Sequence, residues 1–175
     1  MAVTFIPIAS QMLSASAASV TFSAIPQTFT DILVRMSMRN NNAGQFGYPD
    51  PYLIKPNNSN SSYSKIDIVN MDNAASSSVI SNSSEATSRY AVNNGNSTAL
   101  TFSSSEIYIP NYTANSFKQI SVSSVSEFND AAKGGGSYTA ILWRDTSAIT
   151  SLVIQSVFGS FVSGSSFHLY GIKNS

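Results

Sequence analysis

The sequence predicts an all-β protein, built as an antiparallel β-sandwich, a jelly roll or a barrel. Apolar and polar residues alternate with period two through most of the chain, as half-buried strands require. Many of these segments are rich in Val, Ile, Thr, Tyr and Phe, the residues that fit a pleated surface. Clusters of Gly, Asn and Pro that favour turns separate them at short intervals. At 175 residues, positions 1–175 fit one domain of ordinary size.

The N-terminal part contains the clearest alternation. In residues 1–10, Val3, Phe5 and Ile8 belong either to an arm that contacts a partner or to a first strand of the domain. A strand is predicted around Val20 and Phe22, and another where Ile32, Val34, Met36 and Met38 alternate with Leu33, Arg35, Ser37 and Arg39. Further strands are predicted at 65–71, 88–92, 99–102, 106–109, 116–125, 138–144, 149–155 and 166–172.

Other segments interrupt the alternation. Residues 40–64 are predicted to form a long variable loop, because Asn, Ser, Gly and Pro dominate them. The loop contains apolar side chains that pack either on its own domain or on a partner: Phe46, Tyr48, Tyr52 and Leu53. A second Ser/Asn stretch covers 73–84, residues 126–133 form a loop or one helical turn, and Gly134–Gly136 are expected at a hairpin tip.

Composition restricts the possible functions. The chain has no Cys, so disulfide frameworks, thiolate zinc sites and cysteine nucleophiles are excluded. Nine basic and nine acidic residues give a net charge of zero, and without a basic stripe nucleic acid is not an expected partner. No apolar run is long enough to span a bilayer and no signal peptide is predicted, so no membrane is expected. About a fifth of the residues are Ser, and such a hydroxyl-rich, weakly charged surface favours packing against copies or a lattice.

The sequence contains little catalytic chemistry. The only histidine, His168, alternates with Phe167 and Leu169 in a predicted strand and is interpreted as a surface or interface residue. The acidic residues are scattered without a glycosidase signature, and the oxygen ligands between Asp67 and Asn73 do not have EF-hand spacing. Trp143 is expected to pack against its own sheet or a neighbour, although stacking on a sugar is an alternative. We therefore predict no catalytic, cofactor or metal site and no enzymatic activity.

Two ends of the chain resemble a known group of proteins. Residues 17–34 read AASVTFSAIPQTFTDILV, 107–112 read IYIPNY, 117–122 read FKQISV, 148–152 read AITSL, and 161–172 read FVSGSSFHLYGI. The chain is similar to tailed-phage virion proteins of the capsid-decoration, head-fibre and tail-associated type, which share an ASSVTFSSIP-x-T-Y-x-x-L opening and a G-S-x-F-x-L-Y-G-I close. The resemblance implies a jelly-roll-like sandwich, often a homotrimer, with Val20, Phe22, Ile25 and Leu33 in the core. It also implies a close strand approach at Gly171, and it carries over no catalytic residue.

The resemblance leads to an expected function. The chain is expected to be a capsid decoration (cement) protein, made in the host cytoplasm and located on the virion surface, with the major capsid protein and copies of itself as partners. One alternative is a head- or tail-fibre module that contacts host glycans, and a more remote one is a glycan hydrolase. The candidate contact residues are Val3, Phe5, Ile8, Phe46, Tyr48, Tyr52 and Leu53.

Overall fold

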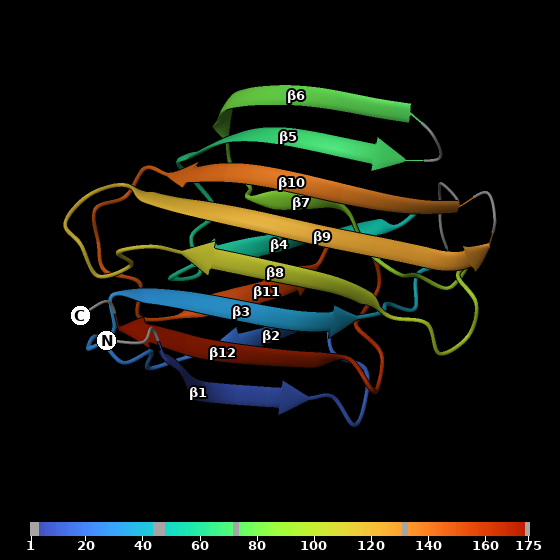
Figure 1. Ribbon diagram of the computed structural model, residues 1–175, viewed down its shortest axis with the longest axis horizontal. Helices are drawn as coiled ribbons and strands as arrows, with labels where there is room; N and C mark the ends of the chain where they lie inside the picture. The colour runs from blue at the N-terminus through green and yellow to red at the C-terminus, as the bar shows by residue number, and fades with distance from the viewer. Residues whose placement is uncertain (1–3, 44–47, 72–73, 131–132, 174–175) are drawn as a thin grey trace.

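Two antiparallel β-sheets stacked face to face make up the fold (Figure 1). The structure is a computed structural model that describes residues 4–43, 48–71, 74–130 and 133–173. The larger sheet has the order β1-β12-β3-β8-β9-β10-β5-β6 and the smaller one β2-β11-β4-β7. The strands are β1 Thr4–Met12, β2 Ser19–Phe22, β3 Asp31–Met38, β4 Asp50–Pro56, β5 Tyr63–Met71, β6 Ala74–Ser83, β7 Thr87–Val92, β8 Ser103–Ile109, β9 Lys118–Asp130, β10 Lys133–Trp143, β11 Leu152–Ser156 and β12 Ser166–Lys173.

The strand order confirms the predicted jelly-roll-like sandwich. When the hairpins β5–β6 and β9–β10 are set aside, the remaining eight strands pair in nested fashion: β1 with β12, β2 with β11, β3 with β8, and β4 with β7. This nesting of first with last is the pairing of a jelly roll, four strands in each sheet. Of residues 1–10, the described ones from Thr4 onward therefore belong to a first strand, since β1 pairs with β12 from Thr4 to Met12.

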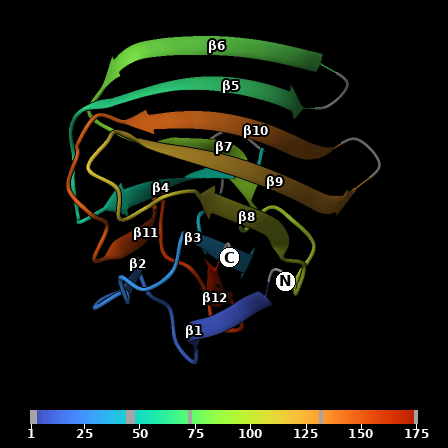
Figure 2. The same ribbon diagram turned by 60° about the vertical axis from the view of Figure 1, so that its left-hand side comes forward.

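The two remaining hairpins enlarge only one of the sheets. Strands β5–β6 and β9–β10, which we call the hairpin extension, add four strands to the β8 side of the larger sheet. The smaller sheet ends at β7, which lies beneath β9 and β10 and reaches β5 (Figure 2). β6 has its contacts almost entirely with β5, so it overhangs the sandwich.

Apolar side chains at every second strand position fill the space between the sheets. Along β3 the side chains of Ile32, Val34, Met36 and Met38 are buried, as predicted, and Phe167 and Leu169 of β12 join them. Trp143 is also buried, against its own sandwich, and so are the predicted core residues Val20, Phe22 and Ile25. Leu33 is buried too, but on the other face of β3, opposite Tyr108 and Tyr170. Within the described residues, no helix is long and apolar enough to cross a bilayer.

Two predictions for irregular segments were wrong. The 40–64 loop contains β4, whose Tyr52, Leu53 and Ile54 are buried. Pro51 argued against a strand there, but it lies where the pairing of β4 with β7 shifts register, so the proline interrupts no regular ladder. The Ser-rich stretch from 74 to 83 is β6, paired with β5 along most of its length.

Three other expectations are corrected in the second half of the chain. Residues 99–102 are not a strand: Leu100 has a φ of 64° in a turn closed by a hydrogen bond from the Thr101 amide to the Thr98 carbonyl. Residues 126–130 continue β9 instead of forming a loop or helical turn. Gly134–Gly136 lie in β10 instead of at the hairpin tip. At Gly135 the absence of a side chain allows β7 to approach closely, since a Cβ there would lie 3.2 Å from Tyr90 Cβ.

Candidate functional site

The candidate contact residues from the sequence lie in different places. Val3 and Phe46 are outside the described residues. Phe5 is exposed on the edge strand β1, with the Arg35 guanidinium 5.8 Å from its ring centre, whereas Ile8 is half-buried against the core. Tyr48 lines a cavity described below. The described candidates therefore do not form one surface.

Tyr52 and Leu53 are corrected as contact residues. Both are buried, because β4 is an inner strand of the smaller sheet with β11 on one side and β7 on the other. The Tyr52 hydroxyl lies 3.3 Å from Ser105 Oγ in a buried network that continues through Ser124 to Ser88. Burial raises the pKa of Tyr52 to about 12, since the phenolate would lose its hydration there. These side chains stabilise the domain and are not available to a partner.

Strand β5 buries its charged side chains and exposes its apolar ones. Lys65 and Asp67 point between the sheets and are buried, while the alternating Ile66 and Ile68 point to solvent and are 50% and 59% exposed. A strand on the surface of a water-soluble domain normally does the reverse. The chain therefore exposes two isoleucines at the cost of burying two charges.

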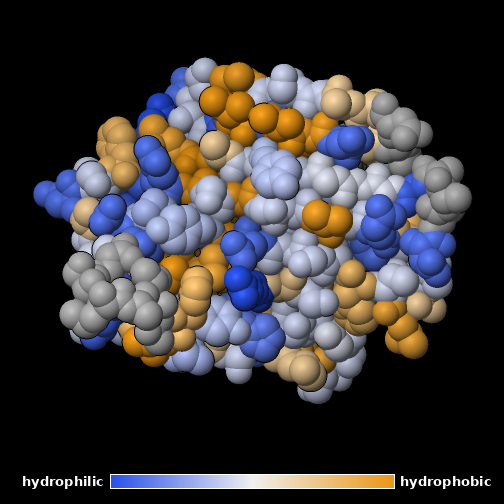
Figure 3. Space-filling view, viewed as in Figure 1, coloured by the Kyte–Doolittle hydropathy of each residue, from blue (hydrophilic) through white to orange (hydrophobic). Residues whose placement is uncertain are grey.

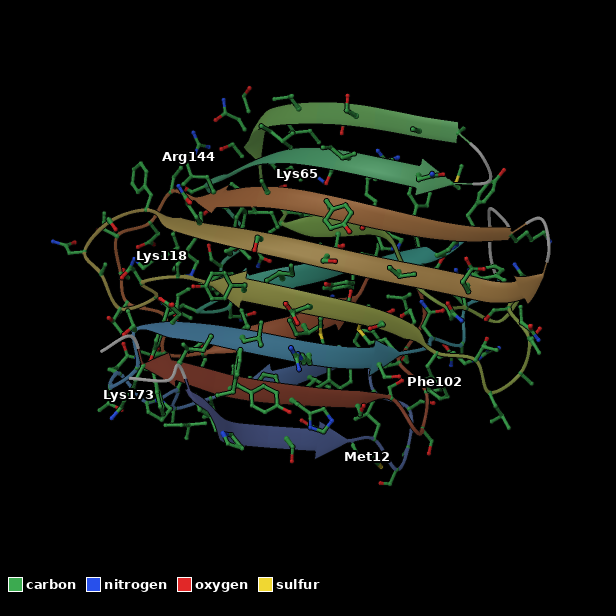
Figure 4. All side chains as sticks on the ribbon, in the orientation of Figure 1. Met12, Lys65, Phe102, Lys118, Arg144 and Lys173 are labelled. Atoms are coloured by element: carbon green, nitrogen blue, oxygen red, sulfur yellow. The ribbon has the colours of Figure 1, made fainter. Side chains whose placement is uncertain are left out.

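The buried charges are fully paired. Lys65 Nζ lies 3.0 Å from Asp67 Oδ2, with the two side chains only 4% and 1% exposed (Figure 4 labels Lys65). Lys65 also donates to Thr87 Oγ1 on β7 at 2.6 Å, and Asp67 accepts from Thr139 Oγ1 on β10 at 2.8 Å and from Ser78 Oγ on β6 at 3.3 Å. Removing two charges from water is costly unless hydrogen bonds complete their shells, and three neighbouring strands supply the hydroxyl groups that do so.

The exposed isoleucines belong to a larger apolar patch on the outer face of the hairpin extension. Ile68 lies opposite Tyr138 of β10, and Ile66 lies opposite Val79 of β6. Val79 is 71% exposed and Tyr138 67%. We call these four residues the apolar patch; hydrophobic atoms gather over β5 and β6 on this face in Figure 3. A groove of about 750 Å³ follows the same strands, and its lining includes Ile66, Val79 and Ile80.

The outer face changes character from one side of the sheet to the other. One row of directly opposed residues runs from His168 through Arg35, Glu106, Ser123 and Tyr138 to Ile68. Arg35 and Glu106 form an exposed ion pair at 3.0 Å, so charge lies on the jelly-roll strands and apolar surface on the hairpin extension. Tyr108, near the middle, donates its hydroxyl to Asp31 Oδ2 at 2.7 Å, and this hydrogen bond raises the pKa of Tyr108 to about 12.

A separate cavity of about 350 Å³ lies near the start of β4 and is lined mainly by aromatic and apolar residues. Tyr48, Tyr90 and Phe158 contribute rings, and the Arg89 guanidinium lies 5.2 Å from the Tyr90 ring centre, with Nη2 3.2 Å from the Tyr90 hydroxyl. Tyr90 has a φ of 51°, an uncommon conformation for a bulky residue. A volume of this size is at the lower end of small-ligand sites.

Asp50 forms the polar wall of this cavity. Its carboxylate accepts hydrogen bonds from the side-chain amides of Asn40 at 2.8 Å, Asn42 at 2.9 Å and Asn94 at 3.3 Å. These amides orient the carboxylate, which can accept a further hydrogen bond from a hydroxyl. Among the described residues, no group of three or more His, Cys, Asp or Glu side chains converges on a metal site.

Sequence reasoning missed the apolar patch. The alternation of Lys65 and Asp67 with Ile66 and Ile68 is visible in the sequence, but by itself it predicts that the isoleucines are buried. Comparison of the chain with models of protein families finds no match, and a search of curated proteins finds none of significant similarity. The function must therefore be inferred from the surfaces described above.

Proposed function

We propose that the chain is a structural subunit on the outside of a phage particle, a capsid decoration protein without catalytic activity. Its hairpin extension would contact the major capsid protein through the apolar patch. The observation that carries this proposal is the orientation of β5, with Ile66 and Ile68 exposed and Lys65 and Asp67 buried. An apolar patch on a domain with 10% charged residues marks an interaction surface.

The position of the patch within the fold supports this proposal. The patch lies on hairpins that a jelly roll does not need, so these strands are free to serve a purpose other than closing the core. Jelly rolls occur in viral capsid proteins and in lectins, which is an analogy of fold and not of function. The sequence resemblance to tailed-phage virion proteins adds the type of particle.

The strength expected of the patch agrees with a decoration role. Burying a Val or Ile side chain fully stabilises by about 1.5–3 kcal/mol, so covering the exposed parts of Ile66, Ile68 and Val79 yields about 3–5 kcal/mol. Association costs at least about 4 kcal/mol in lost freedom, so one patch alone binds weakly. Several copies on a symmetric lattice bind together through avidity, and they stabilise the assembled shell because they bind only that state.

A reconstitution experiment tests the decoration role. Particles that carry the chain are stripped of it and incubated with the wild-type protein, with Ile68→Lys, or with the matched control Leu100→Lys. Leu100 is 87% exposed and lies outside the apolar patch. We expect the wild type and the control to rebind and to restore heat resistance, and Ile68→Lys to bind at least about tenfold more weakly. Unchanged heat resistance after stripping, or equal rebinding of both variants, would contradict the proposal.

The cavity beside Asp50 supports a second candidate function, contact with host glycans as a fibre module. Aromatic rings next to an Arg and a carboxylate can stack on a sugar and bind its hydroxyl groups. Glycan-array binding by the wild-type protein that is lost in Tyr48→Ala and Arg89→Ala would support this role. Failure to bind any glycan, or equal binding by the variants, would eliminate it.

A further inference from the structure

The two edges of the larger sheet differ in their protection against strand pairing. Strand β1 forms one edge and contains Pro7, which has no N–H to donate, and its pairing with β12 shifts register between Pro7 and Ala9. Strand β6 forms the other edge with ten residues, AASSSVISNS, that include no charge, no proline and no glycine. Its ladder with β5 shifts register once, between Tyr63–Ser83 and Lys65–Ile80, and runs without a shift from there to Met71–Ala74.

This difference indicates the partner of β6. Proline, charge and bulges on edge strands prevent pairing with other copies of the same chain. Such copies are the partners that an exposed edge always meets. The chain has such protection along β1, whereas on β6 the stretch from Ala74 to Ile80 contains no proline, charge or register shift. In addition, Val79 and Ile80 expose 71% and 39% of their surface on the two faces of β6, so neither face of the strand is covered by its own domain.

We propose that β6 pairs antiparallel with β6 of a second copy, joining two larger sheets edge to edge. The two-fold axis of such a pair is perpendicular to the sheet, so both outer faces point to the same side. The two apolar patches would then meet at the axis as one uncharged surface, with no like charges on β6 to repel each other. This pairing requires no capsid and is independent of the decoration role.

The dimensions of the edge predict a weak contact in solution. Ten residues at about 3.4 Å each give an edge of about 34 Å. A contact one sheet thick along this length is smaller than a standard interface of about 1,600 Å². The dimer should therefore form at high protein concentration and become persistent where copies are held close together.

Disulfide trapping tests this geometry, because the chain has no Cys and each variant then carries one thiol. Opposed residues of an antiparallel pair point to the same face, so a symmetric β6 pair must place one residue directly opposite its own copy. Each step of one residue away from it separates the two thiols by about 6.8 Å more, beyond the reach of a disulfide.

We expect single-cysteine variants at positions 75 to 80 to show one sharp maximum of dimer formation under mild oxidation, and Gln11→Cys on β1 to show none. The proposal would be overturned if no position crosslinks more than Gln11→Cys. It would also be overturned if all positions crosslink equally.

Sedimentation equilibrium gives a second, thiol-free measurement. We expect Val79→Lys to weaken self-association at least about tenfold while Leu100→Lys leaves it unchanged. Thermal unfolding controls for the fold, since both side chains are exposed. A mass of three copies that Val79→Lys does not reduce would also overturn the proposal, because a two-fold edge pair cannot produce it.

Discussion

The buried ion pair of β5 provides the most direct test of the structure. Replacing Asp67 by Asn preserves the shape of the side chain but leaves the Lys65 ammonium buried without a counter-charge. Removing one partner of a buried pair costs about 3–5 kcal/mol, because the remaining charge is neither hydrated nor neutralised. In a domain of this size, 1 kcal/mol corresponds to a change in Tm of about 2–4 °C, so we expect Tm to fall by about 6–20 °C.

Two matched variants make the result specific. The exposed pair Arg35–Glu106 has the same 3.0 Å separation, yet Glu106→Gln should cost only about 0.2–1 kcal/mol because water screens these charges. The double variant Lys65→Met with Asp67→Leu removes both charges and should recover most of the stability lost in Asp67→Asn. Urea unfolding, compared at equal m-values, measures all three free energies of unfolding.

The refuting result is equally clear. If Asp67→Asn destabilises no more than Glu106→Gln, the Asp67 carboxylate is in water and β5 faces the other way. Ile66 and Ile68 would then be core residues, and the apolar patch would not exist. The proposed contact with a capsid would lose its supporting observation at the same time.

Three other measurements test different parts of the structure. Gly171→Ala should destabilise the domain by about 1–3 kcal/mol, because the new Cβ would lie 2.4 Å from Cγ of the Phe29 ring. The control Gly136→Ala, whose Cβ would have its nearest contact at 3.6 Å, should destabilise it much less. Thermal unfolding compares the two variants. Ile68→Ser should change the free energy of unfolding by no more than about 0.5 kcal/mol, and a larger loss would show that Ile68 is buried. The free energy of unfolding should fall as pH rises from about 10 to about 12. Urea unfolding at each pH measures this free energy, and phenolate absorbance measures the ionisation of the tyrosines. Burial raises the pKa of Tyr52 and Tyr63 to about 12, and the Asp31 hydrogen bond does so for Tyr108. Because these folded-state pKa values lie above the ordinary value of 10.0, the folded state binds protons more tightly, so its advantage is complete below pH 10 and lost above 12. A stability that is flat over this range would contradict the raised values.

Several parts of the fold could be predicted because they depend on local pattern. Along β3 and β12, apolar residues alternate with polar ones, and the apolar face is the buried one. Strand β4 was missed because Pro49 and Pro51 suggest a loop, and only the register shift beside β7 makes a strand acceptable there. Strand β6 was missed because its serines favour no particular structure, and pairing with β5 determines its conformation.

The candidate site shows the same division. An alternating, weakly charged, cysteine-free sequence by itself determined an all-β sandwich with few groups for catalysis. Period two also determined that Lys65 and Asp67 share one face of β5 and that Ile66 and Ile68 share the other. Which face is buried was decided only by the tertiary structure, because burial of two charges depends on hydroxyl groups that distant strands supply. Thr87 of β7 and Thr139 of β10 meet the ion pair between the sheets, and this contact leaves the isoleucines facing outward.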